Sequence, residues 1–506
     1  MLIRWNVIGL LVAYCCTTVY ANKTVRLPTR EHRGTWIATV YNIDWPLSPT
    51  ASVTVQQDQL KHLVAQISRG GLNAVYFQVR PAGDALYQSN IEPWSRFLTG
   101  QNGRAPSPVW DPLQFLISIC HPLGIEVHAW INPYRANLSP TSTDLATNHM
   151  ARVYPQYAYV YNTLLWMDPG AAVVQDRTAQ VALDLVRRYD LDGLHMDDYF
   201  YPYPVAGWTF PDDNTFAAYR ASGGTMAKDD WRRNNVNTLV RRLNTEIHAI
   251  KPWVKFSVSP FGIYRPGHPD GMPPPIAGFD QFSQIFCDPK LWMQQGWVDM
   301  IQPQLYWRID PPAQSYPLLL NWWVAASQNP LVRPVMAGNY LTRVDTDAWP
   351  LDEIRRQVEI SREPANRVRG SWGNVMYSAK MFRDNIQGTV DFFANFIYSQ
   401  PALQPAFDWL YANTSIAVIP RPEVNITSDQ KFYVRNLDTS TESTLLIKQI
   451  AIYKLRGSGW ALIKLLPTGD GGTNWNVGLE LEKGYYAATL VDRFEREGMK
   501  SYFEII

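Results

Sequence analysis

Cysteine is scarce in this chain, which has four in 506 residues. Two of them, Cys15 and Cys16, fall in an N-terminal stretch that we expect to be removed, which leaves Cys120 and Cys287. Two cysteines cannot build a disulfide framework or a cysteine-rich zinc site. No His-x-His or His-x-x-x-His spacing is present either, so we expect no metal and no other cofactor.

A surplus of charge of either sign is also missing. Lys and Arg number 46 against 45 Asp and Glu, so the composition gives no reason to expect binding to nucleic acid or to an anionic membrane surface. Beyond the N-terminus, no apolar run is long enough to cross a bilayer. No glycine-rich phosphate loop follows the first predicted strand, which argues against a doubly wound open sheet.

Residues 1–21 have the pattern of a secretory signal peptide. One arginine supplies the positive charge, residues 7–13 form a short apolar run, and residues 19–21 offer a cleavage site. We therefore expect a periplasmic or secreted protein. Cys15 suggests lipid anchoring as an alternative, but Tyr14 is a large residue to precede a lipidated cysteine, and we favour the unanchored form.

Aromatic residues are abundant, with 20 Trp and 27 Tyr. Flat rings stack on the C–H faces of sugars, but they also fill hydrophobic cores, and composition alone favours the core. The hydrophobic fraction of 46% is ample for a packed interior, and a chain of 506 residues is expected to form two or three domains.

From about residue 33 to residue 400, strand-like apolar runs alternate with amphipathic helices. An apolar face over Val55, Leu60 and Ile67, for example, predicts a helix that ends at Gly70. The repetition predicts an α/β fold, a (β/α)₈ TIM barrel over residues 22–415. The strand candidates are 33–40, 74–81, 126–135, 192–200, 255–262, 299–307, 333–341 and 372–380.

After a proline-rich segment at 419–422 the pattern changes to short alternating runs without a helical period. This predicts a small all-β sandwich, of fibronectin III or immunoglobulin type, over residues 420–506. Its role could be to bind sugar, to dock an envelope protein partner or to act as a spacer. Trp460 and Trp475 are the rings that would bind sugar, although we expect both in the sandwich core.

The most informative run is DGLHMDDYFYP, residues 192–202. Alternation along a strand would turn Leu194 and Met196 toward an apolar layer, and His195 and Asp197 the other way. Asp198 follows where the strand should end. Two like charges held so close raise one pKa, so that one acid can stay protonated while its neighbour is ionised. The run therefore predicts a proton-transfer device among aromatic rings.

The same alternation brings polar groups from other strands to the mouth of the predicted barrel. Any of them could instead fill the barrel interior as a hydrogen-bonded group. Because His128 and His195 lack metal-ligand spacing, we expect them to be structural or to contact substrate. The other candidates are Tyr76, Gln78, Arg80, Trp130, Asn132, Ser257, Ser259, Gln302, Gln304 and Tyr306.

A glycosidase usually needs two carboxyl groups, about 5–5.5 Å apart for retention of configuration and about 6.5–9.5 Å for inversion. Here the acids are adjacent, and the fifth strand end carries no Glu. This favours substrate-assisted cleavage, in which Asp197 polarises a 2-acetamido group and Asp198 is the general acid/base. The loop acids that could supply a distant partner instead, most of which we expect to be solvated, are Asp44, Asp84, Glu92 and Asp168.

Two alternatives stay open. Asp197 could be a direct nucleophile, with a loop acid as proton donor and a non-acetylated polysaccharide as substrate. The chain could also be a non-catalytic glycan-binding envelope protein, because binding sites use Asp to hydrogen-bond sugar hydroxyls too.

The motifs FQVRPAGDALY (77–87), VHAWINPYR (127–135), DGLHMDDYFYP and QPQLYW (302–307) together resemble the glycosyl-hydrolase-like 10 family of bacterial secreted proteins. The resemblance spans about residues 31–410 and leaves the C-terminal sandwich unassigned. It implies a TIM-barrel glycosidase acting on a polysaccharide, with peptidoglycan strands as the expected substrate, since the family includes a divisome-localised peptidoglycan glycosidase.

Matching this sequence to the family motifs places the site around Asp197 and Asp198. The surrounding residues that the motifs match are Arg80, Asp84, Asn132, Tyr134, Arg135 and Tyr306. The roles given to them are our inference from the residues. We add Trp130, His195, Tyr199 and Trp307 as sugar contacts.

Overall fold

The computed structural model describes residues 27–412, 418–427, 432–438, 446–469, 472–478 and 481–506. The predicted signal peptide at 1–21 lies outside the described residues, as do residues 413–417 at the expected domain boundary. Within the described ranges, no helix combines the length and apolar character that a membrane span needs.

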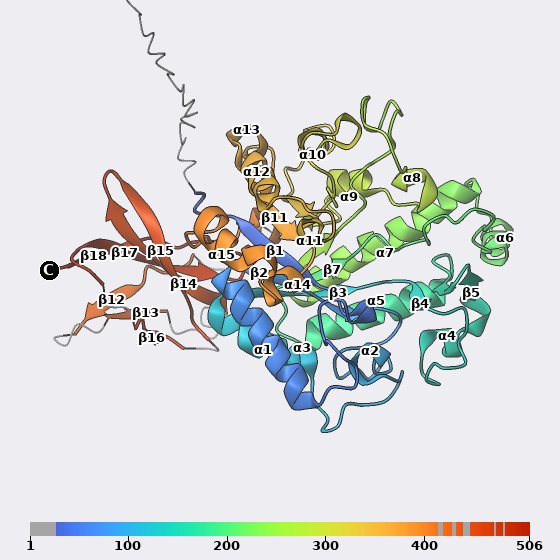
Figure 1. Ribbon diagram of the computed structural model, residues 1–506, viewed down its shortest axis with the longest axis horizontal. Helices are drawn as coiled ribbons and strands as arrows, with labels where there is room; N and C mark the ends of the chain where they lie inside the picture. Colours follow the sequence, from blue (N-terminus) through green and yellow to red (C-terminus); the bar gives the residue numbers. More distant parts are fainter. Residues whose placement is uncertain (1–26, 413–417, 428–431, 439–445, 470–471, 479–480) are drawn as a thin grey trace, which may run out of the picture.

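The strands predicted for the first domain are all present, pair in parallel and close into a barrel (Figure 1). Closure through the pairing of the first strand with the last confirms the TIM barrel and excludes the open sheet. The strands are β1 (His32–Ile37), β2 (Ala74–Arg80), β3 (Glu126–Ile131), β7 (Gly193–Met196), β8 (Lys255–Val258), β9 (Met300–Ile301), β10 (Val335–Asn339) and β11 (Ser371–Met376).

Helices cover the outside of the barrel. In the first of them, α1 (Val53–Arg69), Leu60 and Ile67 are buried and Gly70 is the C-cap, as predicted. Val55 is 46% exposed, so its predicted place on the buried face was wrong. The other longer helices are α3 (Pro112–Cys120), α5 (Ala172–Arg188), α6 (Asp213–Ala221), α7 (Lys228–Ile250), α9 (Pro289–Gln295), α10 (Tyr316–Trp323) and α12 (Leu351–Arg362).

The long connection after β3 forms a small antiparallel sheet that the sequence pattern did not predict. Its strands are β4 (Arg135–Asn137), β5 (Ala158–Tyr161) and β6 (Leu164–Met167). Short helical turns complete the domain: α2 (Arg96–Thr99), α4 (Met150–Val153), α8 (Gln281–Gln284), α11 (Arg343–Thr346), α13 (Pro364–Arg367), α14 (Lys380–Arg383), α15 (Thr389–Phe392) and α16 (Asp408–Tyr411).

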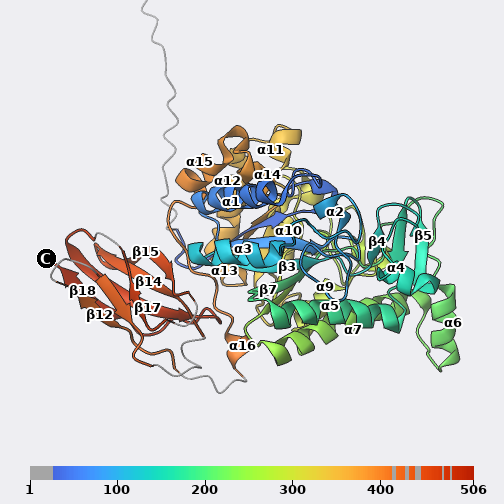
Figure 2. The same ribbon diagram turned by 90° about the horizontal axis from the view of Figure 1, so that it is seen from below.

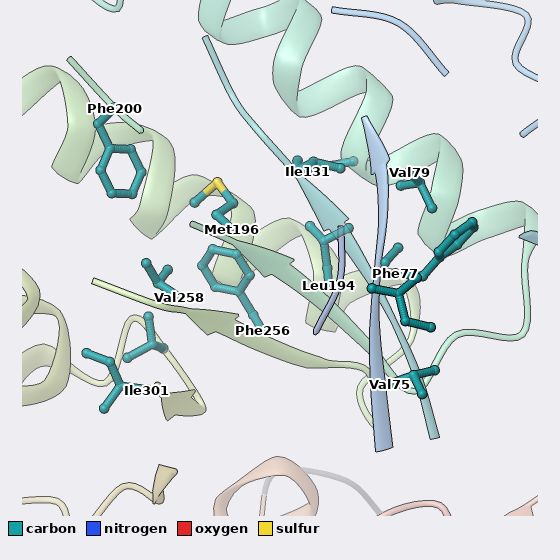
Figure 3. Close-up of a cluster of buried hydrophobic side chains, with 14 of the residues drawn as sticks. Val75, Phe77, Val79, Ile131, Leu194, Met196, Phe200, Phe256, Val258 and Ile301 are labelled. Atoms are coloured by element: carbon teal, nitrogen blue, oxygen red, sulfur yellow. The ribbon is translucent and has the colours of Figure 1, made fainter. Parts of the chain in front are cut away.

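The main core lies between the barrel strands and the helices. Figure 3 shows Leu194 and Met196 of β7 in this layer, beside Phe256 and Val258 of β8. The alternation predicted for β7 is therefore confirmed, and it turns His195 toward the barrel axis.

The C-terminal region is all-β, with two antiparallel sheets around a shared core. Val434 of one sheet and Ile450 and Leu490 of the other belong to this core. Trp475 packs against it as expected and donates to the carbonyl of Thr468 at 2.8 Å. Trp460 packs instead on the opposite face of its sheet, so its expected place in the sandwich core was wrong. The strands are β12 (Glu423–Ile426), β13 (Phe432–Arg435), β14 (Ile447–Arg456), β15 (Gly459–Pro467), β16 (Asn474–Asn476), β17 (Gly484–Asp492) and β18 (Ser501–Ile505).

Buried charges fasten this sandwich to the amino ends of the barrel strands. Lys448 of β14 binds Glu126 at the start of β3 (2.6 Å) and Asp192 just before β7 (3.2 Å). It also binds Glu495 (2.8 Å), which in turn lies 3.4 Å from Lys255 at the start of β8. Figure 1 and Figure 2 accordingly show the C-terminal strands at one end of the molecule and β5 with α6 at the other.

Candidate active site

Asp197 and Asp198 lie directly after β7, at the carboxyl end of the barrel. Both side chains are almost completely buried, at 4% and 2% exposed. Each carboxylate therefore depends on protein groups for its hydrogen bonds, and those groups differ between the two acids.

Asp197 is surrounded by donors. It accepts hydrogen bonds from Trp130 Nε1 (3.0 Å), from Asn132 Nδ2 (3.3 Å) and from the backbone N–H of Tyr199 (3.4 Å). Burial raises the pKa of this carboxyl above its usual value, and the charge of Arg135 and the donors oppose that rise without cancelling it. These donors favour the ionised form of Asp197.

Asp198 is bound by fewer groups. The phenol of Tyr203 donates to its Oδ2, and the side chain of Gln304 donates to the carboxylate as well. Burial, and after it the charge of Asp197, raise the pKa of Asp198 to about 7. The charge of Asp197, expected from the sequence to be the main cause of the raised pKa, is therefore second to burial. Near neutral pH, Asp198 can hold a proton beside an ionised Asp197.

Half-buried tyrosines from several strand ends gather around the two acids. The ring of Tyr306 lies 4.7 Å from that of Tyr340 and 6.0 Å from that of Tyr377, between centroids. Tyr199 lies 5.7 Å from Tyr203 in the same way. Such rings are amphipathic, and they suit the apolar faces and hydroxyl rims of sugars.

A sequence model of the glycosyl hydrolase-like 10 family matches residues 31–349. The chain belongs to this family. It is 38% identical to "Glycosyl hydrolase YngK" of Bacillus subtilis over 389 residues, which cover 75% of this chain and 74% of that protein. It is 36% identical to "Glycosyl hydrolase DigH" of Escherichia coli over 369 residues, which cover 67% of this chain and 81% of that protein.

Among solved structures, the PgaB (BpsB) glycoside hydrolase domain of Bordetella bronchiseptica aligns with a TM-score of 0.45 at 14% identity. The alignment covers 73% of this chain and 99% of that chain. The match to the glycosyl hydrolase-like 10 family ends at residue 349, before β11, and the barrel assignment comes from the strand pairing itself.

In this glycosyl hydrolase-like 10 protein, the structure brings together most of the predicted sugar contacts. Trp130 and Asn132 bind Asp197, and the guanidinium of Arg135 lies 5.0 Å from the centroid of the Tyr199 ring. Trp307 is half-buried, and its ring meets that of Phe261 edge-on at 5.6 Å. Their contact with a sugar stays a prediction.

Arg80 and Asp84 have other partners. Arg80 donates to the backbone carbonyl of Asn132 (2.6 Å) and pairs with Glu92 (3.1 Å), and its side chain is fully buried. Asp84 accepts from the N–H of Ala82 at 3.0 Å. Arg80 thus holds the loop after β3 and Asp84 the loop after β2, and their contact with substrate also stays a prediction. Tyr134, whose side chain is fully buried, lies in the loop after β3.

His195 lies inside the barrel with no exposed surface. Its Nε2 accepts from Trp36 Nε1 (3.1 Å), and its Nδ1 lies 2.8 Å from Ser257 Oγ. Burial holds its pKa well below the usual value, so the ring is neutral. The structure gives His195 the interior role that was one of its two expected roles. Among the described residues, no group of His, Cys, Asp or Glu is arranged to hold a metal ion.

The loop acids are buried rather than solvated, so that expectation was wrong for all of them. Asp44, Asp84, Glu92 and Asp168 are each at most 2% exposed. Asp168 accepts from the N–H of Gly170 and from Thr215, both at 2.7 Å. Neither Asp84 nor Asp168, the candidates for a distant proton donor, binds Asp197 or Asp198.

Three residues of the candidate site were not predicted from the sequence. Tyr203 lies in a loop, where no periodicity indicates the direction of a side chain. Tyr340 and Tyr377 directly follow β10 and β11. The rule that functional groups lie just past strand ends would have found these two.

Proposed function

We propose that this chain is a glycoside hydrolase that cleaves N-acetylated glycan strands, with peptidoglycan as its substrate. The observation that carries the proposal is the inequality of the two acids. Asp198 has a pKa of about 7, while Asp197 is surrounded by donors that favour its charged form. Membership of a glycosyl hydrolase-like family supports the same reading.

In the proposed reaction, Asp198 gives its proton to the glycosidic oxygen as the bond from that oxygen to the anomeric carbon breaks. The carbonyl oxygen of the 2-acetamido group supplies the electron pair for the new bond to that carbon. Asp197 accepts a hydrogen bond from the acetamido N–H and stabilises the positive charge that develops. Water then adds to the anomeric carbon as the bond between that carbon and the acetamido oxygen breaks, which restores the acetamido group, and the proton of the water returns to Asp198.

Secretion or residence in the periplasm is part of the proposal, because peptidoglycan lies outside the cytoplasm. Its support is the pattern of residues 1–21. The tyrosines around the acids, together with Trp130 and Trp307, would form the sugar platform.

The test is incubation with peptidoglycan strands before and after removal of their stem peptides, with the products identified by mass spectrometry. We expect the full chain to release oligosaccharides from stripped strands, and Asp198→Asn to release almost none. Asp58→Asn, a change at an exposed acid on α1, is the matched control and should cleave like the wild type. If the wild type releases nothing from either preparation, the proposal is wrong.

A further inference from the structure

The sheet β15-β14-β17-β18 has one face in the sandwich core and the other toward the barrel. On the barrel-facing side, Tyr453, Ala487 and Val491 pack with Leu403 of the barrel domain. The barrel covers only part of this face.

Beyond the covered part, the same face carries aromatic side chains. Trp460 pairs directly opposite Leu455, and Tyr485 opposite Glu504, so each pair shares a face. Tyr502 is two residues from Glu504 and so joins them. Tyr485 is 55% exposed and Tyr502 65%, which is unusual for such large rings.

These residues enclose a shallow hollow. The rings of Trp460 and Tyr502 lie 5.4 Å apart between centroids, although their strands are at opposite edges of the sheet. The hollow has a volume of about 410 Å³, and Leu455, Tyr485 and Glu504 also line it.

A second cavity, also of about 410 Å³, adjoins Trp460 between the sandwich and the barrel domain. Its lining is more polar and includes Thr29, Gln400 and Arg456. Trp460 lines both cavities, which therefore lie side by side, the first among aromatic side chains and the second among hydrogen-bonding groups.

We propose that this surface binds a glycan strand. A pyranose ring presents apolar C–H faces that stack on Trp and Tyr, and a rim of hydroxyls that suits Glu504, Gln400 and Arg456. A protein partner would need about 800 Å² on each side for a stable interface, whereas each hollow has the size of a small-ligand site. The choice of a glycan rests on the proposed function of the barrel.

The position of the surface defines its role. The sandwich is fastened by Lys448 to the amino ends of the barrel strands, whereas Asp197 and Asp198 lie at the carboxyl ends. A strand held on the aromatic face is therefore not delivered directly to the acids. The surface anchors the protein on polymer, and it should matter for insoluble glycan and not for short soluble oligosaccharides.

The experiment uses the full chain with Tyr485→Ala and Tyr502→Ala combined. Both side chains are more than half exposed, so the fold should survive. Retention on insoluble peptidoglycan stripped of stem peptides, and on chitin, is measured by sedimentation. Hydrolysis of a soluble N-acetylglucosamine oligosaccharide is measured in parallel. Phe396→Ala, at a ring 64% exposed on the barrel domain, is the control.

We expect at least about a tenfold loss of retention in the double variant, none in the control, and equal rates on the soluble oligosaccharide. Equal retention of wild type and double variant overturns the inference. The inference is also overturned if the wild type self-associates through this face while the double variant is monomeric and is still retained on the glycan. If no protein releases oligosaccharides from peptidoglycan but the double variant alone loses retention, this inference stands and the proposed function fails.

Discussion

The phenol of Tyr203 donates a hydrogen bond to Asp198, the acid five positions earlier in the chain. The Tyr203 ring is held in turn by Phe279, on which it stacks at 5.1 Å between centroids with an interplanar angle of 24°. This bond lowers the pKa of Asp198 against the larger effect of burial, which raises it. Tyr203 therefore adjusts the pH range over which Asp198 can act as an acid.

Replacing Tyr203 by Phe removes that bond and should raise the pKa of Asp198. The alkaline limb of the pH profile of kcat/KM should then move to higher pH. Tyr433→Phe, on β13 of the sandwich, is the control and should leave the profile unchanged. An alkaline limb that stays in place, or moves to lower pH, would show that Tyr203 does not act on this acid.

The wild-type profile itself should be bell-shaped. Activity should fall above about pH 7 as Asp198 loses its proton, and fall at low pH as Asp197 gains one. Because burial raises the pKa of Asp197 as well, the acid limb should lie above the usual range of an aspartate. Activity that is constant from pH 6 to pH 9 would contradict this assignment.

The raised pKa of Asp198 should also make the free energy of unfolding depend on pH. A carboxyl whose pKa is raised in the folded state binds its proton more tightly there, so the fold loses stability as pH rises through the window from about 4 to 7. Asp198→Asn cannot ionise and should escape this loss. Its free energy of unfolding should gain on the wild type by up to about 1.4 kcal/mol per pH unit in that window. Urea unfolding at several pH values measures the difference, and a constant gap would refute the raised pKa.

The roles of Asp197 and Asp198 should be distinguishable with substrates whose leaving groups differ in their need for a proton. Asp197→Asn and Asp198→Asn should each lower kcat on glycan strands by roughly 10²–10⁴-fold. An aryl glycoside of N-acetylglucosamine has a leaving group that needs no proton, so it should restore much of the rate to Asp198→Asn and little to Asp197→Asn. If the aryl glycoside instead restores the rate to Asp197→Asn and not to Asp198→Asn, then Asp197 is the proton donor and Asp198 orients the acetamido group.

Arg80 should affect stability more than substrate binding. Arg80→Met leaves the buried Glu92 short of its main partner and should cost about 3–5 kcal/mol in the free energy of unfolding. Lys61→Met, in an exposed pair with Asp58, should cost less than about 1 kcal/mol. Arg80→Lys is the variant to use if Arg80→Met does not fold. A raised KM without loss of stability would indicate substrate contact instead.

The barrel could be predicted from the sequence because each strand is a buried run between amphipathic helices. Even β9, which comprises only Met300–Ile301, lies inside its predicted run. The sheet formed by β4, β5 and β6 could not be predicted in this way. Tyr159 and Val160 in β5 are partly exposed, so burial imposes no clear alternation on that strand.

In the site, alternation gave the direction of a side chain but not its height along the barrel axis. His195 and Asp197 point the same way, yet one is enclosed by Trp36 and Ser257 while the other reaches the strand end. Arg80 pairs with Glu92 from the loop after its own strand, and periodicity carries no information about such loops. Gln304, one partner of Asp198, was among the candidates that alternation placed at the barrel mouth, whereas Tyr203, the other partner, could not be predicted because it comes from a loop.

The most direct test compares the turnover of wild-type protein on matched glycan strands with and without their N-acetyl groups. If the acetamido oxygen is the nucleophile and Asp197 only orients it, acetylated strands are cleaved and de-N-acetylated strands react at least about 100-fold more slowly. Equal rates on the two would contradict this mechanism and make Asp197 the direct nucleophile.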